Sequence, residues 1–381
     1  MTAAPARATL LDRWEALGRP LSRLPRWAAG LVLVLLAAAM IWSVGATRPL
    51  AEAEAARVAA STAKVTAAPS QAPAKPKGDL ALYARIAERM AAGEGYYDAA
   101  MDEQRASNYP TTPFVSVRQP TLAWMQTLIG VAGVRYLEFA LVLACLWAAQ
   151  QKLAAMASVS LPERLGALML LVLGGAAVVV PKAGLIHELW AGLALTLALL
   201  LYRPDRWWPA LLAAAAAIAV RELAVPFVLL WLVFALAARR WAEAAGVAAL
   251  LALFAAGMTA HAFAVEAGRL ASDPASQGWD ALIGYGLPLM ALTRLTGLML
   301  LPVTAAAPLA LLPLVGWAGI GGRLGLFALL WSAGTFTMIA LFARPDNFYW
   351  AQLALPAYGI GLAFAPRALA ELVLRAAGRE T

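Results

Sequence analysis

The sequence predicts an all-α, polytopic membrane protein with about ten transmembrane helices and one large outer loop. The chain has 381 residues, of which 62% are hydrophobic, and its mean hydropathy is +0.71. A soluble protein of this length needs more polar surface to cover its core. Apolar runs of about 18 residues or more recur along the chain, and each is long enough to cross a bilayer as a helix. These runs are rich in Ala and Leu and do not alternate with period two, so we expect helices rather than a closed barrel.

The first predicted span follows a basic leader. Five arginines precede an apolar run at 27–46, namely Arg7, Arg13, Arg19, Arg23 and Arg26. A cleaved signal peptide is the alternative interpretation, but its apolar region is shorter than this run. We therefore predict a cytoplasmic segment at 1–26 and a retained first span at 27–46.

Nine further spans are predicted within a bundle at 134–365, and residues 366–381 form a tail. A weaker helix near 281–295 is expected in an outer region. The spans lie at 136–150, 165–180, 185–201, 207–220, 223–238, 241–263, 299–320, 324–342 and 348–365.

The charges between these runs predict which side of the membrane each loop faces. Ten spans place both termini on one side, together with basic loops that contain Lys152, Arg164, Arg203, Arg206, Arg239, Arg240 and Arg323. Basic loops face the cytoplasm in membrane proteins. We therefore predict a multi-pass protein of a bacterial inner membrane, with both termini cytoplasmic and the outer loops periplasmic.

The first outer loop divides into a tether and a structured part. Residues 47–78 are rich in Ala, Pro and Lys, which predicts a flexible tether of low complexity. Structure is expected to resume with an amphipathic helix that has Asp79 as its N-cap candidate and ends near Gly93. Its apolar face contains Leu82, Ile86 and Met90 and is suited to a membrane surface. A second interfacial helix is expected at 119–130, so residues 79–133 form a loop with interfacial helices and the candidate active site.

The composition argues against several other classes of protein. The formal net charge of +8 is spread over small clusters rather than one basic face, so nucleic acid is not an expected partner. The single cysteine, Cys145, lies in an apolar run and is expected to be a small core residue. With two histidines, one late in a span, a histidine-based metal site is not expected.

Ionisable residues gather at the predicted outer face. They are Asp79, Arg118, His187, Glu188, Arg221, Glu222, Arg344 and Asp346. Charges near the membrane are expensive and favour a functional interpretation. Taken singly, each has an ordinary alternative: Arg221 and Glu222 form a surface ion pair of little value, and His187 is a satisfied structural histidine.

In the first outer loop the stretch GDLALYARIAERMAAGEGYY is followed by YPTTPFVSVRQPTLAW. This loop resembles that of the GT-C membrane glycosyltransferases, such as the protein O-mannosyltransferases and the lipid A aminoarabinose transferase. In those proteins an acid after the first span precedes a tyrosine-bearing helix, a Gly-acid pair, and a basic residue before a Pro-containing helix that ends in Trp. Here these elements are Asp79, Tyr83, Gly93-Glu94 and Arg118, followed by the helix from Pro120 to Trp124.

The resemblance implies transfer of a sugar from a polyprenyl-phosphate donor to a lipid, glycan or protein acceptor. A carboxylate accepts the proton of the acceptor hydroxyl, and this role falls to Asp79. Arginine suits the lipid phosphate because its fork is bidentate and always charged. Arg118 takes this role by motif, and Arg344 and Arg221 are added from their positions. The expected sugar or acceptor contacts are Tyr83, Glu94, His187, Glu188 and Glu222.

Two departures from the family pattern concern the substrate. Leu80 and Val117 stand where the relatives often have acids. No metal or other cofactor is expected. A divalent cation is the less favoured alternative, with oxygen ligands from Asp79, Glu94, Asp98, Asp102 and Glu103.

Two other functions stay open at the level of the sequence. A transporter or flippase for a lipid-linked or anionic substrate would have inverted repeats and ionisable groups near the midplane, and it would give substrate flux without sugar transfer. A non-catalytic relative would be unaffected by Asp79→Asn.

Overall fold

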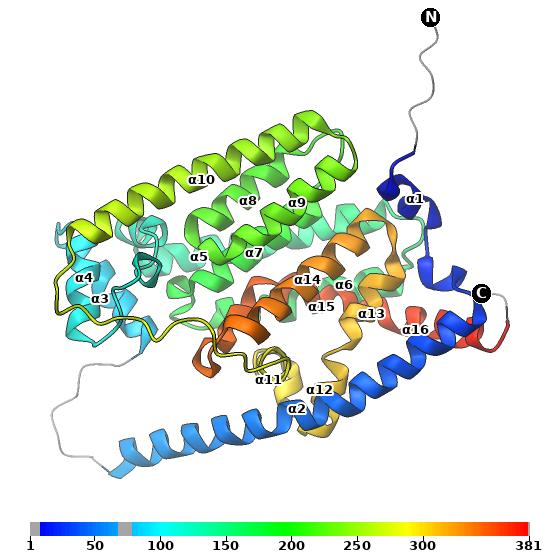
Figure 1. The fold of residues 1–381 in the computed structure, drawn as a ribbon, viewed down its shortest axis with the longest axis horizontal. Coiled ribbons are helices and arrows are strands. Elements are labelled where there is room, and N and C mark those ends of the chain that lie inside the picture. Colours follow the sequence, from blue (N-terminus) through cyan, green and yellow to red (C-terminus); the bar gives the residue numbers. More distant parts are fainter. Residues whose placement is uncertain (1–7, 68–77, 380–381) are drawn as a thin grey trace, which may run out of the picture.

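Every regular element that the structure describes is a helix. The structure is a computed structural model, and it describes residues 8–67 and 78–379. In this part of the chain the only β-type pairing is an isolated bridge between Thr112 and Ala275. The helices form an elongated bundle, with α1 (Leu10–Leu17) and the C-terminus at one end and α3 (Asp79–Ala91) at the other (Figure 1). We call these the α1 end and the α3 end.

The long helix α2 (Arg26–Ala67) replaces the predicted short span and most of its tether. The prediction of a flexible tether from residue 47 was therefore wrong up to residue 67. Its Ala-rich segment is polar, but Ala, Glu and Arg are strong helix formers. Arg48 also pairs with Glu52 one turn later, at 2.8 Å. The remainder of the predicted tether, 68–77, lies outside the described residues.

A small helical unit at the α3 end contains α3, α4 (Tyr96–Ala106) and the 3-10 turn η2 (Phe114–Ser116). The predicted helix from Asp79 is confirmed. Its apolar face, however, does not lie free for a membrane surface. Leu82, Ile86 and Met90 are buried in a separate core with Met101 of α4 and Val265 of α10. The apolar side of α3 is thus used for packing within the protein.

Helix α5 (Thr121–Ala154) contains both the predicted second helix of the loop and the next span. The two parts meet at Gly130, whose φ of 72° is not helical. Glycine adopts this left-handed conformation without the steric cost that a Cβ imposes. The expected boundary at residue 130 is therefore a break within one long element.

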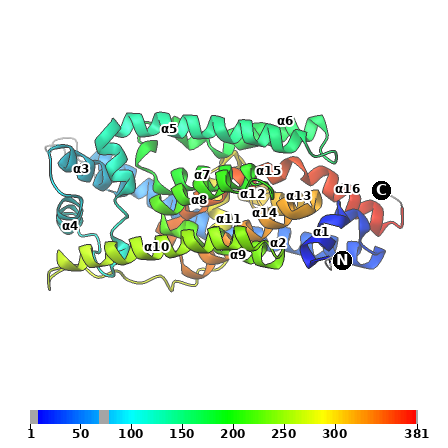
Figure 2. The same ribbon diagram turned by 90° about the horizontal axis from the view of Figure 1, so that it is seen from above.

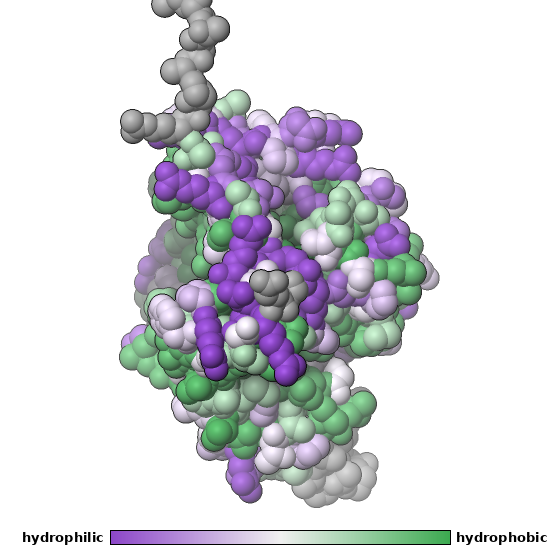
Figure 3. Space-filling view, turned by 90° about the vertical axis from the view of Figure 1, so that its right-hand side faces the viewer, coloured by the Kyte–Doolittle hydropathy of each residue, from purple (hydrophilic) through white to green (hydrophobic). Residues whose placement is uncertain are grey.

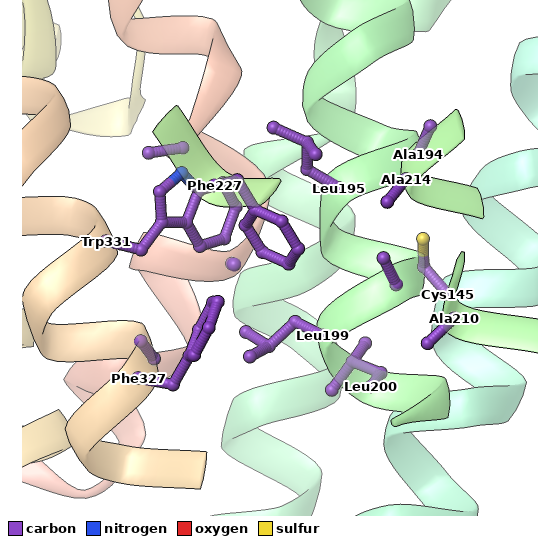
Figure 4. Packing of buried hydrophobic residues seen from close by; sticks show 14 of the residues in the cluster. Cys145, Ala194, Leu195, Leu199, Leu200, Ala210, Ala214, Phe227, Phe327 and Trp331 are labelled. Atoms are coloured by element: carbon purple, nitrogen blue, oxygen red, sulfur yellow. The ribbon is translucent and has the colours of Figure 1, made fainter. Parts of the chain in front are cut away.

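The centre of the bundle is formed by α6 (Leu161–Gly174), α7 (His187–Leu201), α8 (Trp208–Val220), α9 (Val225–Ala237) and α10 (Trp241–Ala267). Helices α7 and α8 lie between α5 and α10 (Figure 2). Helix α7 is buried along almost its whole length. Small residues such as Ala194, Ala210 and Ala214 allow α7 and α8 to pack closely, and Cys145 of α5 lies beside them as the predicted core residue (Figure 4).

The C-terminal third contains shorter and broken helices. These are α11 (Gly286–Arg294), η6 (Gly297–Leu300), α12 (Val303–Leu309), α13 (Leu312–Ile320), α14 (Gly322–Phe342), η7 (Pro345–Leu353), α15 (Leu355–Ile360), η8 (Gly361–Ala363) and α16 (Ala365–Ala376). The predicted spans at 299–320 and 348–365 are therefore series of short helices. Proline in the first turn of α13, α15 and α16 explains several of these new starts, since it lacks the backbone N–H that an unbroken helix needs.

Five described helical stretches are long and apolar enough to cross a membrane, or six if one bent pair is counted as a span. They are Arg26–Ala60, Phe114–Ala154, Trp241–Ala267, Val303–Ile320 and Gly322–Phe342, and the pair is Leu355–Ala363 with Ala365–Ala376, bent by 50°. The chain is thus an all-helical, multi-pass membrane protein. Helices α7, α8 and α9 are apolar but shorter, and 13 to 15 residues rise only about 20 Å.

Hydrophilic residues gather over the centre and the upper part of the face at the α1 end, and apolar side chains lie beside and below them (Figure 3). Ion pairs join the N-terminal segment to late helices here, as between Arg19 and Glu371 and between Arg323 and Asp12. Arg367 in addition pairs with Glu163 at the start of α6. These contacts fix α1 and α16 against the transmembrane part.

Candidate functional site

A cavity of about 1100 Å³ at the α3 end contains most of the residues predicted for the site. Its walls come from α3, the segment 108–118, the start of α7, the loop 274–279 and η7. Six of the predicted residues line it, namely Asp79, Tyr83, Arg118, His187, Glu188 and Arg344. Segments far apart in the sequence thus meet at one end of the bundle.

Asp79 is the first residue of α3 and is held by two tyrosines. The hydroxyl of Tyr109 donates to its Oδ1 at 2.7 Å, and that of Tyr349 donates to its Oδ2 at 3.1 Å. Burial, followed by the bond to Asp79, raises the pKa of Tyr109, so its hydroxyl stays a donor. A carboxylate has about four lone-pair sites. Asp79 is therefore oriented and still able to accept a proton from a further hydroxyl.

Arg118 follows η2 and points into the same cavity. Its Nε donates to the hydroxyl of Tyr83 at 2.9 Å, and its backbone carbonyl accepts from Tyr96 at 2.5 Å. Its two terminal nitrogens lie 3.9 Å from Glu188 and from Glu222. The guanidinium is thus fixed along one edge, while its contacts with the two carboxylates are long.

Arg221 lies beneath the cavity rather than on its wall. Its side chain is 1% exposed, its Nε donates to Glu188 at 2.7 Å, and its NH1 pairs with Glu222. Its guanidinium also lies over the ring of Trp350, at 5.9 Å. A buried arginine with these partners does not reach a ligand, so the prediction that Arg221 binds phosphate does not agree with its position.

The same cluster explains the places of Glu188 and Glu222. Glu188 lines the cavity, whereas Glu222 does not. Together with Arg118 and Arg221 they form a group of two cations and two carboxylates. The sequence neighbours Arg221 and Glu222 are therefore not a plain surface pair, because both take part in this mostly buried cluster.

His187 begins α7 and contacts Tyr83. Their rings meet edge to face, with centroids 4.8 Å apart. Its Nδ1 is buried and has no hydrogen-bond partner among the described residues. The interpretation as a fully satisfied structural histidine is thus incomplete, and His187 belongs to the wall of the cavity.

Three further cations lie on the wall, and one of them, Arg57, pairs with Asp346. Arg344 donates to the carbonyls of Gly278 and Gln277, at 3.0 and 2.6 Å, which fixes the loop 274–279 over the cavity. Lys182, in the turn before α7, is exposed at the rim, and the described residues include no ion-pair partner for it. Lys182 is thus a cation without a neutralising neighbour at this end.

Glu94 lies outside the cavity. Its carboxylate pairs with Arg89 at 2.5 Å, near the end of α3, which accounts for its position at the outer surface. The expectation that Glu94 contacts a sugar is not supported by this position.

Two acidic residues of α4 are likewise engaged by arginines. Asp102 pairs with Arg89 and Arg105, and Glu103 pairs with Arg85. In the described part of the chain no group of three or more His, Cys, Asp or Glu side chains is placed to hold a metal ion. The alternative cation site made of Asp79, Glu94, Asp98, Asp102 and Glu103 is therefore not assembled.

Sequence reasoning did not select three residues that the structure brings to the site, namely Tyr109, Tyr349 and Lys182. Tyr109 lies in the stretch YPTTPF, which carries part of the family resemblance, and Tyr349 lies in the aromatic turn 344–350, where rings are typical of membrane-interface anchors. Lys182 lies in a predicted outer turn. Its charge was the available signal, because a short outer turn seldom carries a basic residue.

The cavity combines charge of both signs with aromatic rings. Its charged side chains are Arg57, Arg118, Lys182, Arg344, Asp79, Glu188 and Asp346, and its rings include Tyr83, Tyr109, Trp279 and Tyr349. Cations bind anionic groups, while hydroxyls and rings bind polar ring-shaped ligands such as sugars. Comparison with known protein families, curated proteins and solved structures gives no match to this chain.

Proposed function

We propose that this protein is a membrane glycosyltransferase that transfers a sugar from a polyprenyl-phosphate donor to an acceptor at the outer face of a bacterial inner membrane. The observation that carries the proposal is the presence of Asp79 and Arg118 on the wall of one cavity at one end of a membrane bundle. A base and an anion-binding cation in one site are the two groups that this reaction needs.

In the proposed reaction Asp79 acts as the general base. The acceptor hydroxyl gives its proton to the carboxylate while its oxygen forms a bond to the anomeric carbon. The bond between that carbon and the phosphate oxygen breaks, and its electron pair leaves with the polyprenyl phosphate, which gains one negative charge. Tyr109 and Tyr349 hold the carboxylate in place through one oxygen each. Because the carboxylate is already held in place, less entropy is lost when it is oriented toward the acceptor hydroxyl.

Arg118 stabilises the leaving phosphate, and Arg57, Lys182 and Arg344 are the other cations of the wall. Arg118 keeps only long contacts with Glu188 and Glu222, so its terminal nitrogens are available to a phosphate that comes closer. Arg221 acts indirectly, since it holds both carboxylates away from Arg118. His187 and Tyr83 contact the sugar or the acceptor.

We place the α1 end in the cytoplasm and the α3 end in the periplasm. This topology counts the short helices α6, α7, α8 and α9 and the broken segments as spans and so has ten passes. Lys152, Arg203 and Arg323 meet at the α1 end, which is the side that the positive-inside rule assigns to the cytoplasm.

The test uses purified protein, a polyprenyl-phosphate sugar and measurement of sugar transfer. Asp79→Ala is expected to lower turnover at least about 100-fold, the size of a general-base effect, while donor binding persists. Arg118→Gln is expected to weaken donor binding. Glu94→Gln is the matched control, since Glu94 is an acid of the same loop outside the cavity.

Two results contradict the proposal. Full turnover in Asp79→Ala removes the assigned base. Movement of the lipid-linked sugar across proteoliposome membranes by the wild-type protein, without transfer to any acceptor, identifies a transporter instead. Thermal unfolding of each variant distinguishes a loss of activity from a loss of the folded structure.

A further inference from the structure

A second cavity, of about 440 Å³, lies at the α1 end and shares no lining residue with the first. This volume falls within the range of about 300–1,000 Å³ typical of small-molecule sites. Its walls come from α1, α5, α7, α9 and α14. The cavity is therefore enclosed by the N-terminal helix and by four helices of the bundle.

The deep part of this cavity is apolar. Leu199, Phe227, Trp231 and Phe327 line it, and the side chains of Leu199, Phe227 and Phe327 lie together in the packed core (Figure 4). On α9 the lining extends from Phe227 to Ala238, which is about 16 Å at 1.5 Å per residue. This length is about half of the 30 Å hydrocarbon core of a bilayer, the depth that one acyl chain occupies.

The residues at helix ends around the cavity are mostly cationic. Lys152, at the end of α5, donates to the carbonyl of Tyr202 at 2.5 Å, and Arg203 directly follows. Glu15 of α1 is the one acid of the lining, and it is already engaged by the backbone N–H of Arg323 at 2.9 Å. No ion pair of Arg203 is found among the residues that the structure describes, so Lys152 and Arg203 provide positive charge that Glu15 does not balance.

Helix α1 closes one side of the cavity. Leu11 is buried against it, and the indole N–H of Trp14 donates to the carbonyl of Gly322 at 2.9 Å. Arg323 also pairs with Asp12 at 2.5 Å. Helix α1, which precedes the first span, is thus fixed as a wall of the apolar cavity. The basic helix ends lie beside this wall.

We propose that this cavity binds an anionic phospholipid of the adjacent leaflet, with one acyl chain among the apolar residues and the phosphate at Lys152 and Arg203. The apolar depth fits a chain, and the unbalanced cations fit a phosphate. The site is separate from the proposed sugar-transfer site and does not depend on its chemistry.

The test counts lipids on the purified, delipidated full-length chain by native mass spectrometry. Phosphatidylglycerol is expected to bind with at least tenfold higher affinity than phosphatidylcholine with the same acyl chains. Arg203→Gln is expected to remove most of this preference, and Ala238→Phe, which fills the cavity near the helix ends, is expected to remove the bound lipid.

Matched controls come from adjacent residues. Arg206→Gln removes a charge from the same turn, and Ala237→Phe adds a ring to the same helix end, but neither residue lines the cavity. Both are expected to bind phosphatidylglycerol as the wild-type chain does. Arg203 is exposed, so its variant is expected to keep the wild-type unfolding temperature.

Three results overturn the proposal. The first is equal affinity of the wild-type chain for the two lipids. The second is an equal loss of the preference for phosphatidylglycerol in Arg203→Gln and Arg206→Gln. The third is unchanged lipid binding in Ala238→Phe. A soluble phosphate is distinguished by competition: displacement of phosphatidylglycerol by millimolar inorganic phosphate at constant ionic strength assigns the basic residues to a free anion, and this also overturns the lipid site.

Discussion

Arg221 shows how a single side chain supports the cavity at the α3 end without lining it. It is nearly fully buried and joins Glu188 to Glu222. Because the ion pairs are withdrawn from water, removal of one partner leaves charges that are expensive to bury. The position of Glu188 on the cavity wall thus depends on a residue behind it.

We expect Arg221→Gln to lower the free energy of unfolding by about 3–5 kcal/mol, because the buried carboxylate of Glu188 and the partly buried carboxylate of Glu222 lose their main cation. Thermal unfolding of the purified protein measures this loss. Arg48→Gln is the control, since Arg48 and Glu52 form an exposed pair that is worth at most about 1 kcal/mol. Equal stability of the two variants would show that the buried cluster contributes no more than a surface pair.

Asp273 ties the loop after α10 to α4. It accepts from Nε of Arg105 at 2.6 Å and from the backbone N–H of Leu270 at 3.1 Å. The bond from Arg105 lowers the pKa of Asp273 from 3.8 to about 2. A lowered pKa in the folded state means that the carboxylate stabilises the loop above pH 3.8 and that this contribution is lost as the pH falls toward 2.

We therefore expect pepsin to cut the loop 268–280 slowly at pH 4 and progressively faster as the pH falls to 2, relative to an unstructured reference peptide. Relative to the same reference peptide, the Asp273→Asn variant is expected to be cut at pH 4 at a rate close to that of the wild-type protein at pH 2. A wild-type rate that does not change over this interval, relative to the reference peptide, would refute the assigned role of the carboxylate.

At the scale of elements, close helix packing determines the positions of the residues that line the cavity at the α3 end. Gly192 of α7 lies against the backbone of η7, and a Cβ at this position would be 2.1 Å from the carbonyl oxygen of Gln352. Tyr349, which holds Asp79, belongs to the same η7. The distance between α7 and η7 therefore sets where this tyrosine lies.

Gly192→Ala is expected to destabilise the fold by about 1–3 kcal/mol, as overpacked cores do, and to reduce sugar transfer through displacement of Tyr349. The matched control is Gly257→Ala in α10, where a Cβ meets nothing within 4 Å. This control is expected to be neutral or to stabilise the protein by up to about 1 kcal/mol. Denaturation curves of both variants provide the comparison, and similar curves would contradict the packing argument.

Helix lengths were the least predictable property of the elements. Apolar runs located the central helices to within a few residues, as for α7 and α14. The same criterion ended the first span near residue 46, because the rest of α2 is polar, although its Ala and Glu content favours helix. Hydropathy detects apolar segments, which lipid or the protein core covers. A helix that continues into a polar region has no hydropathy signal over that region.

At the scale of the whole molecule, the two cavities lie at opposite ends of the bundle. The cavity at the α3 end is surrounded by α3, the loop 274–279 and η7. The cavity at the α1 end is surrounded by α1 and the basic helix ends. The proposed topology places these ends on opposite sides of the membrane. It can be tested independently of either ligand.

Single cysteines are expected to report this topology. Glu88 at the α3 end and Ala16 on α1 are exposed, whereas the native Cys145 is fully buried. An impermeant maleimide is expected to label Glu88→Cys in intact spheroplasts and Ala16→Cys only after the membrane is opened. The reverse pattern would invert the topology, and labelling of both cysteines in intact spheroplasts would exclude an odd number of crossings between them.

The sequence by itself determined that this is a helical membrane protein, which residues form most of its helices, and which acid and arginine of the first loop to examine. These properties depend on local composition and spacing. Only the tertiary structure decided that Asp79 is held by Tyr109 and Tyr349, that Arg221 lies beneath the cavity, and that Glu94 lies outside it. Such neighbours are brought together from distant turns, and the packing of α7 against η7 and of α3 against α5 sets their distances.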